Sequence, residues 1–389
     1  MLQTVKVNKK YFTKLDLSTI PSPCYVIDIK VLEDNLKIFK KLKADTNVKI
    51  LLALKAFSLK SLFPIISNVL DGVCASGLNE AKLGKKYFGG LISTYSPAFK
   101  NTEFNEIINF SNHITFNSIS QINKYKKLCA NKNIDIGVRI NPLYSEVMVP
   151  KYNSSNLNSR LGIHINQLDK LDFTDIKGIH IHSLCEQNFN ALENTWNKIW
   201  PFLKNIVKNL EWINLGGGHH ITRSDYNIKE LTSFILELKT KTNCQIILEP
   251  GEAIVFQSGI LVGEILDYIG GDNNKIPNIC ITDISPVCHM PDVIEAPYRP
   301  ILMNEPIKGQ KVILGGPSCL AGDIIGEYNF LKKPNIGDKV VFLDQAHYTL
   351  VKTNFFNGIN HPEVILWNSD NNDFKIAKSF NFKDFETRN

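Results

Sequence analysis

The chain has 389 residues, of which 43% are apolar and 21% are charged, and its formal net charge is +6. This composition is typical of a soluble globular protein, and the length exceeds what one ordinary hydrophobic core accommodates, so we expect two domains. The lysines are spread along the chain, which argues against a nucleic-acid partner, and no apolar run reaches the length of a membrane span or a signal peptide.

The eight cysteines contain no C-x-x-C pair, so the sequence suggests neither a zinc site nor a disulfide framework. Cysteines that remain as free thiols are the rule in reducing compartments. We therefore expect a cytoplasmic protein.

Eight short apolar or β-branched runs follow one another through the first two thirds of the chain. They lie at residues 48–55, 70–76, 91–96, 113–116, 134–141, 175–183, 211–218 and 244–250. Several segments between or before them have helical periodicity, among them 31–43, 118–130 and 226–241. Alternating strands and helices indicate βαβ units around a parallel sheet, and eight units over about 200–250 residues fit a (β/α)8 TIM-type barrel. An open doubly wound sheet is the alternative that periodicity leaves open.

After about residue 258 the pattern changes to strands separated by turn signals. The expected strands are 259–269, 278–285, 311–316, 338–345 and 363–367, and the early segments 2–7 and 22–28 could join them. We therefore expect an α/β protein in which residues 28–257 form the barrel. Residues 258–389, together with 1–27, would form a second, β-rich domain.

Polar residues and glycines fall at six of the predicted strand ends, where TIM barrels carry their chemistry. They are Lys55, Ser76, Arg139, His182, the triplet Gly216–Gly218 and Glu249. Lys55 follows an apolar run, and loss of hydration there disfavours its charged form. A neutral lysine amine is a nucleophile towards aldehydes. The alternative is a lysine that extends from the strand end into water.

The late strand ends suggest a cofactor. Three successive glycines, Gly216, Gly217 and Gly218, let backbone N–H groups approach an anion such as phosphate closely, although a tight turn is the alternative. Glu249 could form a salt bridge or hydrogen-bond a protonated ring nitrogen.

His180 and His182 lie on one face of a strand and could bind a metal. No aspartate closes the eighth strand, so a metal-dependent hydrolase is the less favoured alternative. The imidazole of His182 could instead stack on a flat aromatic cofactor. Lysine, phosphate cradle, carboxylate and stacking ring together describe a pyridoxal phosphate site.

The chain resembles the fold-type III pyridoxal phosphate enzymes, the group of alanine racemase and of the diaminopimelate and ornithine decarboxylases. The resemblance covers nearly the whole chain and is carried by the motifs LLALKAF, CASGLNE, VRINP, RLGIH, NLGGGHH, LEPGEA and FFNGI. The motifs HSLCEQ, HMPD with PYRP, and SCLAGD point to the carboxynorspermidine/carboxyspermidine decarboxylase branch. The implied reaction converts carboxynorspermidine or carboxyspermidine to norspermidine or spermidine and CO2.

The resemblance also implies residue roles. Lys55 would bind the cofactor aldehyde covalently, His182 would stack on its ring, and Glu249 would bind the pyridine nitrogen. Further residues implied to contact the cofactor are Arg139 near the phenolic oxygen, the phosphate-binding Gly216, Gly217, Gly218 and Tyr348, and Gly251. Cys319 would reach across a dimer interface and protonate the substrate carbon after CO2 leaves. A homodimer with shared active sites follows from that role.

Three departures from relatives concern the substrate. Val73 stands where ornithine-type enzymes carry an aspartate, and Leu320 where diaminopimelate-type enzymes carry an acid; both argue against those substrates. Glu252 replaces an arginine of ornithine-type enzymes, which fits a substrate with positive charge. A cationic tail needs carboxylates, and the candidates are Glu252, Asp283, Asp292, Glu295 and Asp323, with Asp323 and Asp283 first. Arg299 is the candidate partner of the substrate carboxylate. Decarboxylation of meso-diaminopimelate or ornithine, or a non-catalytic regulatory role, are the alternatives.

Overall fold

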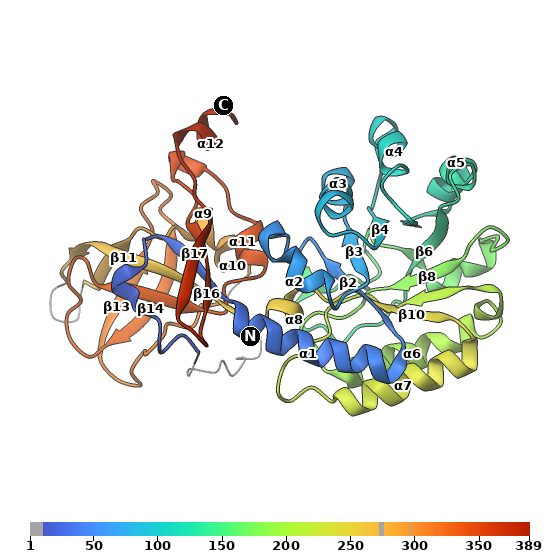
Figure 1. Cartoon of the computed structure of the whole chain (residues 1–389), viewed down its shortest axis with the longest axis horizontal. Helices are drawn as coiled ribbons and strands as arrows, with labels where there is room; N and C mark the ends of the chain where they lie inside the picture. The colour runs from blue at the N-terminus through green and yellow to red at the C-terminus, as the bar shows by residue number, and fades with distance from the viewer. Residues whose placement is uncertain (1–10, 272–275, 297) are drawn as a thin grey trace. The chain divides into compact units, whose positions relative to one another are not determined.

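The computed structural model describes residues 11–271, 276–296 and 298–389, and the chain divides into two compact units (Figure 1). One unit is Asp34–Ile254; the other combines Met1–Glu33 with Val255–Asn389. The expected barrel, 28–257, is slightly longer at each end than the first unit. The expected strand at 2–7 lies outside the described residues.

The unit Asp34–Ile254 is a closed parallel barrel, as predicted. Its strands are β2 (Lys49–Ala53), β3 (Gly72–Ala75), β4 (Leu91–Tyr95), β5 (His113–Phe116), β6 (Asp135–Asn141), β8 (Gly178–Ile181), β9 (Trp212–Asn214) and β10 (Gln245–Leu248). Each pairs in parallel with its neighbour, and β10 pairs with β2, so the ring closes. All eight predicted runs contain one of these strands, and closure excludes the open doubly wound sheet. The short β7 (Ile163–His164) pairs beside β6.

Helices alternate with these strands and lie around them (Figure 1). They are α1 (Ile29–Thr46), α2 (Phe63–Ser67), α3 (Leu78–Tyr87), α4 (Asn101–Ile107), α5 (Ile119–Ala130), α6 (Phe189–Leu203), α7 (Ile228–Thr242) and α8 (Glu252–Val255). The expected helices at 31–43, 118–130 and 226–241 are thereby confirmed as α1, α5 and α7. Local chemistry sets their ends: the Ser118 side chain caps α5, and Asn227 caps α7. Asn243 ends α7 in the left-handed conformation.

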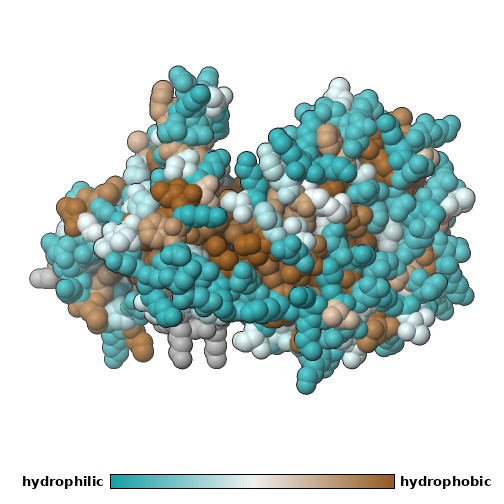
Figure 2. Space-filling model, viewed as in Figure 1, coloured by the Kyte–Doolittle hydropathy of each residue, from teal (hydrophilic) through white to brown (hydrophobic). Residues whose placement is uncertain are grey.

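The surface of the barrel unit seen in Figure 2 is mainly hydrophilic, with scattered apolar residues.

Short 3-10 helices complete the connections of both units: Leu17–Thr19, Lys60–Leu62, Pro150–Tyr152, Ile165–Lys170, Val207–Asn209 and Phe356–Gly358. Among the described residues, no helix is long and apolar enough to cross a membrane.

Trp212 closes the N-terminal part of the barrel interior. Its indole stacks on the ring of His113 on β5, with centroids 5.0 Å apart and planes 4° apart. A Cβ at Gly178 on β8 would lie 2.0 Å from Cδ2 of the indole, and one at Gly137 on β6 would lie 2.2 Å from Cη2. The ring therefore extends from β9 past β8 and β6 to β5. Leu51 and Ile247 also pack against it.

The second unit is a mixed sheet. Its strands are β1 (Cys24–Asp28), β11 (Gly259–Ile269), β12 (Asn278–Thr282), β13 (Gln310–Gly315), β14 (Ile324–Phe330), β15 (Lys339–Leu343), β16 (Glu363–Asn368) and β17 (Asp373–Lys378). The order is β14-β13-β12-β11-β1-β16-β17, and β15 also pairs with β11. The early segment 22–28 joins this sheet as β1, between β11 and β16.

The strands expected after residue 258 are all present, but β14 and β17 were not predicted. Both lie at the ends of the strand order, and most of their residues are exposed or half-buried. An edge strand with little buried surface has a weak apolar pattern, which explains the omission. Short helices were also missed: α9 (Pro286–His289), α10 (Pro291–Glu295), α11 (Tyr348–Val351) and α12 (Phe382–Glu386).

We expect Gly178→Ala to destabilise the protein by about 1–3 kcal/mol, because the added methyl group overlaps the Trp212 indole and the barrel must shift to admit it. The thermal unfolding midpoint, followed by circular dichroism, should fall. Gly322→Ala is the control, since its Cβ would meet nothing within 4 Å. An unchanged midpoint for Gly178→Ala would contradict a tightly filled barrel floor.

Candidate active site

A polar layer lies next to Trp212 inside the barrel. Side chains alternate along a strand, so Asn214 on β9 shares the inward face with Trp212. His180 on β8 is in register with Asn214, and Glu249 directly follows β10. The Asn214 Nδ2 amide donates to Glu249 Oε1 at 2.7 Å. His180 Nε2 lies 3.1 Å from Glu249 Oε2, and the two side chains are only 5% and 12% exposed.

The carboxylate of Glu249 is ionised despite its burial. Burial acts to raise its pKa, but His180, Asn214 and Lys55 together lower it below its ordinary value. Cys74 on β3 responds in the opposite direction. Burial and then the negative charge of Glu249 raise the pKa of the Cys74 thiol, which therefore stays protonated beside the carboxylate.

His182 is a neutral ring. The amide of Gly217 donates to His182 Nδ1 at 2.9 Å, so Nδ1 is an acceptor and the ring proton belongs on Nε2. Burial, and then the charges of Lys55 and Arg139, hold its pKa well below 6.5. An uncharged imidazole offers a flat face that an aromatic ring can approach without loss of charge hydration.

Arg139 contributes a buried positive charge from β6. Its side chain is anchored by Nη2, which donates to the carbonyl oxygen of His182 at 3.3 Å. The guanidinium lies over the ring of Tyr95, 4.7 Å from the centroid, and Tyr95 Oη donates to Asn117 Oδ1 at 2.8 Å.

The backbone of the glycine triplet lies so close to neighbouring groups that a side chain would not fit there. Gly216 and Gly218 have φ values of +70° and +80°. A Cβ at Gly217 would lie 2.3 Å from the carbonyl oxygen of Glu249, and one at Gly218 would lie 2.1 Å from that of Leu184.

We expected all three glycine amides to face an anion, but two of them have partners inside the barrel. The Gly216 amide donates to Asn214 Oδ1 at 2.9 Å and the Gly217 amide to His182 Nδ1. Within the described chain, the Gly218 amide has no acceptor. Only this last amide of the triplet is therefore available to a bound anion.

Lys55 is exposed in the turn that follows β2. Its charge acts on Glu249 and His182, lowering the pKa of each, which places it within electrostatic reach of both. Gly251 supports this turn, because a Cβ there would lie 2.5 Å from the Cβ of Ala56. The Ala53 amide also donates to the carbonyl oxygen of Pro250 at 3.0 Å. The expected cofactor residue Gly251 thus packs the eighth strand end against the Lys55 turn.

His219 and His220 follow the glycines and are buried. Burial lowers the pKa of His219 to about 4. For His220 burial acts in the same direction, but Glu252 outweighs it and raises the pKa. Glu252 Oε1 lies 3.6 Å from His220 Nε2. Glu252, a candidate for the substrate tail, therefore lies beside a histidine of its own unit.

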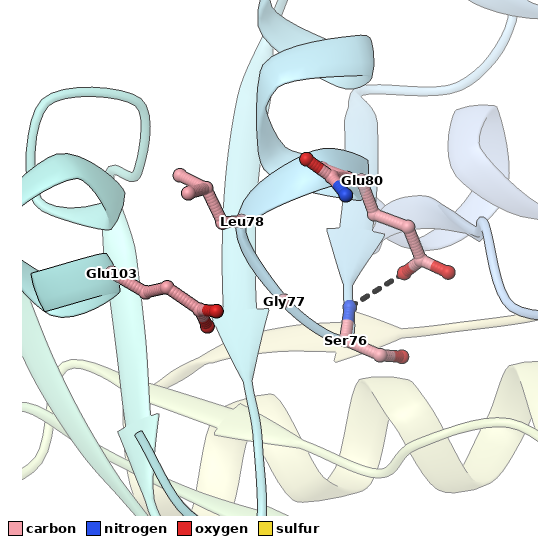
Figure 3. Close-up of a pocket in the computed structure, with 6 residues that line it drawn as sticks. Ser76, Gly77, Leu78, Glu80 and Glu103 are labelled. Atoms are coloured by element: carbon pink, nitrogen blue, oxygen red, sulfur yellow. Dashed lines mark hydrogen bonds between the residues drawn. The ribbon is translucent and has the colours of Figure 1, made fainter. Parts of the chain in front are cut away.

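A cavity of about 280 Å³ lies beyond the end of β3, where Ser76, another of the strand-end residues, is found (Figure 3). It is lined by Ser76, Gly77, Leu78, Asn79, Glu80 and Glu103. The Ser76 amide donates to Glu80 Oε2 at 2.6 Å, and burial raises the pKa of Glu80. Its lining holds none of the expected cofactor residues.

In the sheet unit, Cys319 is exposed in a loop between β13 and β14. Its amide donates to Asn357 Oδ1 at 2.8 Å. Tyr348, the expected phosphate contact, is the first residue of α11.

Asp323 organises the loop that carries Cys319. The hydroxyl of Ser285 donates to both of its carboxylate oxygens at 2.9 Å. The amides of Val287 and Ser318 donate to it at 3.0 and 3.2 Å. Asp323 is 2% exposed, so these donors compensate a buried carboxylate.

The remaining expected substrate residues also have partners in the sheet unit. The Ser22 hydroxyl and the Glu264 amide donate to Asp283 at 2.5 and 2.8 Å. Arg299 pairs with Glu305 and lies over the ring of Tyr328, 3.8 Å from its centroid.

Asp292 and Glu295 both lie beside Lys352. Lys352 Nζ lies 2.5 Å from Asp292 Oδ1 and 3.4 Å from Glu295 Oε2. Both acidic residues of α10 therefore contact the same lysine.

The barrel thus brings together Lys55, Arg139, His182 and Glu249 with the glycine triplet. The residues that we missed are Asn214, Cys74, Tyr95 and the role of His180 beside Glu249. Strand alternation could have placed Asn214 and His180 on the inward face. Within the described ranges, no group of three or more His, Cys, Asp and Glu side chains is arranged to hold a metal ion.

We expect His219→Gln to make the stability less sensitive to acid. The unfolded chain binds a proton at His219 below about pH 6.5, whereas the folded ring stays neutral down to about pH 4, so this group lowers stability as the pH falls between those values. The urea midpoints of the wild-type protein and of His219→Gln would be measured at about pH 7.5, 6 and 5. The loss of stability of each protein is taken relative to its own midpoint at pH 7.5. Equal losses in both proteins would contradict a buried neutral His219.

Comparison with known proteins places the chain in a family. Residues 24–346 match the family model described as "Pyridoxal-dependent decarboxylase, C-terminal sheet domain". The chain is 38% identical to the carboxynorspermidine/carboxyspermidine decarboxylase of Campylobacter jejuni, over 95% of this chain and 99% of that protein. It is 37% identical to the carboxyaminopropylagmatine decarboxylase of Synechocystis, over 96% of each.

Solved structures agree with the sequence relatives. The crystal structure of carboxynorspermidine decarboxylase from Campylobacter jejuni, complexed with norspermidine, matches with a TM-score of 0.87 and 36% identity over 95% of this chain and 100% of that one. The diaminopimelate decarboxylase of Helicobacter pylori, complexed with L-lysine, matches with a TM-score of 0.83 at 15% identity, over 96% of this chain and 98% of that one, a likeness of fold.

The barrel residues fit the cofactor that this family uses. Glu249 is an ionised carboxylate, as an acceptor for a protonated ring nitrogen would have to be, and His182 offers a neutral aromatic face. The Gly218 amide is available beside a turn whose space a Cβ would fill. The chain belongs to the pyridoxal-dependent decarboxylases, enzymes whose cofactor is pyridoxal phosphate.

Proposed function

We propose that this protein decarboxylates carboxynorspermidine or carboxyspermidine, giving norspermidine or spermidine in polyamine biosynthesis. The observation that carries the proposal is the near full-length match to the Campylobacter jejuni enzyme, whose solved structure holds norspermidine. All eight cysteines are free thiols, which supports a cytoplasmic location.

The barrel residues supply binding and proton placement. When bound, pyridoxal phosphate provides an electron sink for the negative charge left at Cα as CO2 departs. Lys55 would hold the cofactor through its aldehyde carbon, and Glu249 would keep a proton on the ring nitrogen. The neutral ring of His182 would stack on the cofactor, and the Gly218 amide would donate to its phosphate.

The proton that replaces CO2 at Cα comes, in this proposal, from Cys319 of the second subunit of a homodimer. The exposure of its thiol and the anchoring of its loop by Asp323 support this role. A loop held by a buried carboxylate can present a thiol reproducibly to a neighbouring molecule.

For the cationic tail of the substrate, we favour Asp292 and Glu295 over Asp323 and Asp283. The latter two carboxylates accept hydrogen bonds from their own unit, whereas Asp292 and Glu295 both lie beside Lys352, so two acidic side chains occur together on one short helix. Neighbouring carboxylates attract an ammonium group. Arg299 pairs with Glu305, so its proposed contact with the substrate carboxylate requires that pair to open.

A tail ending in a guanidinium group is a second candidate, because the Synechocystis relative acts on carboxyaminopropylagmatine and is 37% identical. A planar guanidinium binds a carboxylate through two parallel hydrogen bonds, whereas an ammonium is a compact point charge. A guanidinium tail therefore requires a carboxylate oriented for two parallel hydrogen bonds, whereas an ammonium tail requires a nearby negative charge. Diaminopimelate, ornithine and a non-catalytic role remain the alternatives.

The proposed substrate is tested by CO2 release from the cofactor-loaded protein. The compounds are carboxynorspermidine, carboxyspermidine, carboxyaminopropylagmatine, meso-diaminopimelate and ornithine. We expect the first two to be turned over with kcat/KM at least about tenfold above the others, equivalent to about 1.4 kcal/mol in the transition state. The Lys55→Ala protein provides the blank and should release none.

Fastest release from carboxyaminopropylagmatine would reassign the substrate to the guanidinium class. Preference for diaminopimelate or ornithine would overturn the polyamine assignment while leaving the cofactor site in place. Absence of release from every compound, with cofactor bound, would favour the non-catalytic alternative.

The shared site is tested by mixing two inactive variants, Lys55→Ala and Cys319→Ala. In a homodimer with shared sites, a mixed dimer contains one intact site. Random exchange in an equal mixture gives half mixed dimers, each with one working site of two, so activity should return to about one quarter of wild type.

Each variant alone, and an unmixed sum of the two, are the controls. Cys319→Ala should still bind the cofactor and show its visible absorbance. Failure of the mixture to regain activity, after exchange of subunits has been demonstrated, would contradict a site completed by the partner subunit.

A further inference from the structure

We infer that His180 is a positioning residue for the reaction: it holds the carboxylate of Glu249 and thereby controls how tightly the protonated ring of pyridoxal phosphate is bound. The inference rests on the proposal that Glu249 meets the ring nitrogen. It does not depend on which amine is the substrate.

The first support is the geometry of the carboxylate. Its two oxygens have different partners from neighbouring strands, Asn214 Nδ2 at 2.7 Å from Oε1 and His180 Nε2 at 3.1 Å from Oε2. A carboxylate has about four lone-pair positions, so both oxygens retain capacity for another donor. His180 and Asn214 are paired residues of β8 and β9, and strand register therefore sets the orientation of Glu249.

The second support is the setting of His180 itself. Its side chain is 5% exposed, and its two buried ring nitrogens make no hydrogen bond of standard geometry in the described parts of the chain. Nε2 instead lies in ion-pair contact with Glu249, 3.1 Å from Oε2. Aromatic rings lie beside it, Tyr95 at 5.7 Å and His182 at 6.3 Å between centroids. Within the described parts of the chain, its close polar contact is with Glu249. Its polar function is therefore exerted on that carboxylate.

The third support is the energetic demand of the site. A buried carboxylate without compensating partners is strongly disfavoured and becomes protonated instead. Of the groups that oppose this tendency at Glu249, His180 has the largest effect on the pKa, ahead of Asn214 and Lys55. Loss of His180 would favour the neutral carboxyl group, which no longer stabilises a proton on the ring nitrogen.

His182 does not duplicate this role. Its Nδ1 accepts the Gly217 amide at 2.9 Å, so that nitrogen is already engaged with the glycine turn. The two histidines on the same strand face therefore have different roles. His182 offers its ring to the cofactor, and His180 acts on the cofactor through Glu249.

A double-mutant cycle tests the inference. The variants are His180→Leu, Glu249→Gln and the combination, and the readouts are the Kd for pyridoxal phosphate and the pH dependence of its bound visible absorbance. We expect His180→Leu to raise Kd about tenfold, which corresponds to one unit of pKa in the carboxylate. In the Glu249→Gln background the same change should add little, because the two residues act as one unit.

His180→Gln is the conservative variant, since its side-chain amide can still donate to Oε2. It should recover most of the affinity lost in His180→Leu. His180→Asn, which is polar but too short to reach, should resemble the leucine variant and serves if His180→Leu does not fold. Thermal midpoints of the cofactor-free proteins separate loss of structure from loss of binding.

Additive effects in the cycle would overturn the inference, since His180 would then act independently of Glu249. A wild-type Kd and absorbance in His180→Leu, with Glu249→Gln impaired, would also overturn it. If Glu249→Gln itself binds cofactor normally, the role of Glu249 fails and the inference fails with it, while the substrate assignment is untouched.

Discussion

One buried negative charge governs the arrangement of the barrel interior. Glu249 keeps its charge because Asn214 and His180 approach its two oxygens and Lys55 lies within electrostatic reach. These residues come from different strands, so the closed sheet is what brings them together. Burial, and then the same charge, raise the pKa of the Cys74 thiol. The polar layer is therefore a set of mutually dependent groups, in which removal of one partner alters the proton affinity of the others.

Absent side chains are as important to this arrangement as present ones. Gly137 and Gly178 leave room for the Trp212 indole, which fills the barrel below the polar layer. At the mouth of the barrel, the glycine triplet allows backbone segments to approach closely, and Gly217 lies against the backbone of Glu249. The apolar floor and the tight turn thus enclose the carboxylate from two sides. Exclusion of water from this layer strengthens each electrostatic contact within it.

The barrel could be predicted from the sequence because each strand is a short apolar run with turn signals at its ends, and strand ends identify the face that carries chemistry. Lys55, His182 and Glu249 were predicted in this way, and the structure places each of them at the end of a barrel strand. Contacts across the interior could not be predicted, since alternation gives the face of His180 but not its distance from Glu249. Likewise, the sequence cannot reveal that the Gly216 and Gly217 amides, or the carboxylates of Asp283 and Asp323, have partners within their own units. The strands β14 and β17 were missed because exposed edges lack a strong apolar pattern.

A crystal structure of the protein loaded with pyridoxal phosphate would test this account most directly. The account predicts a carboxylate oxygen of Glu249 at about 2.7–2.9 Å from the pyridine nitrogen, the distance of a charge-assisted hydrogen bond, with His180 still beside the carboxylate. Lys55 should be joined covalently to the cofactor. A ring nitrogen that meets another residue, or a Glu249 turned away from the ring, would contradict it.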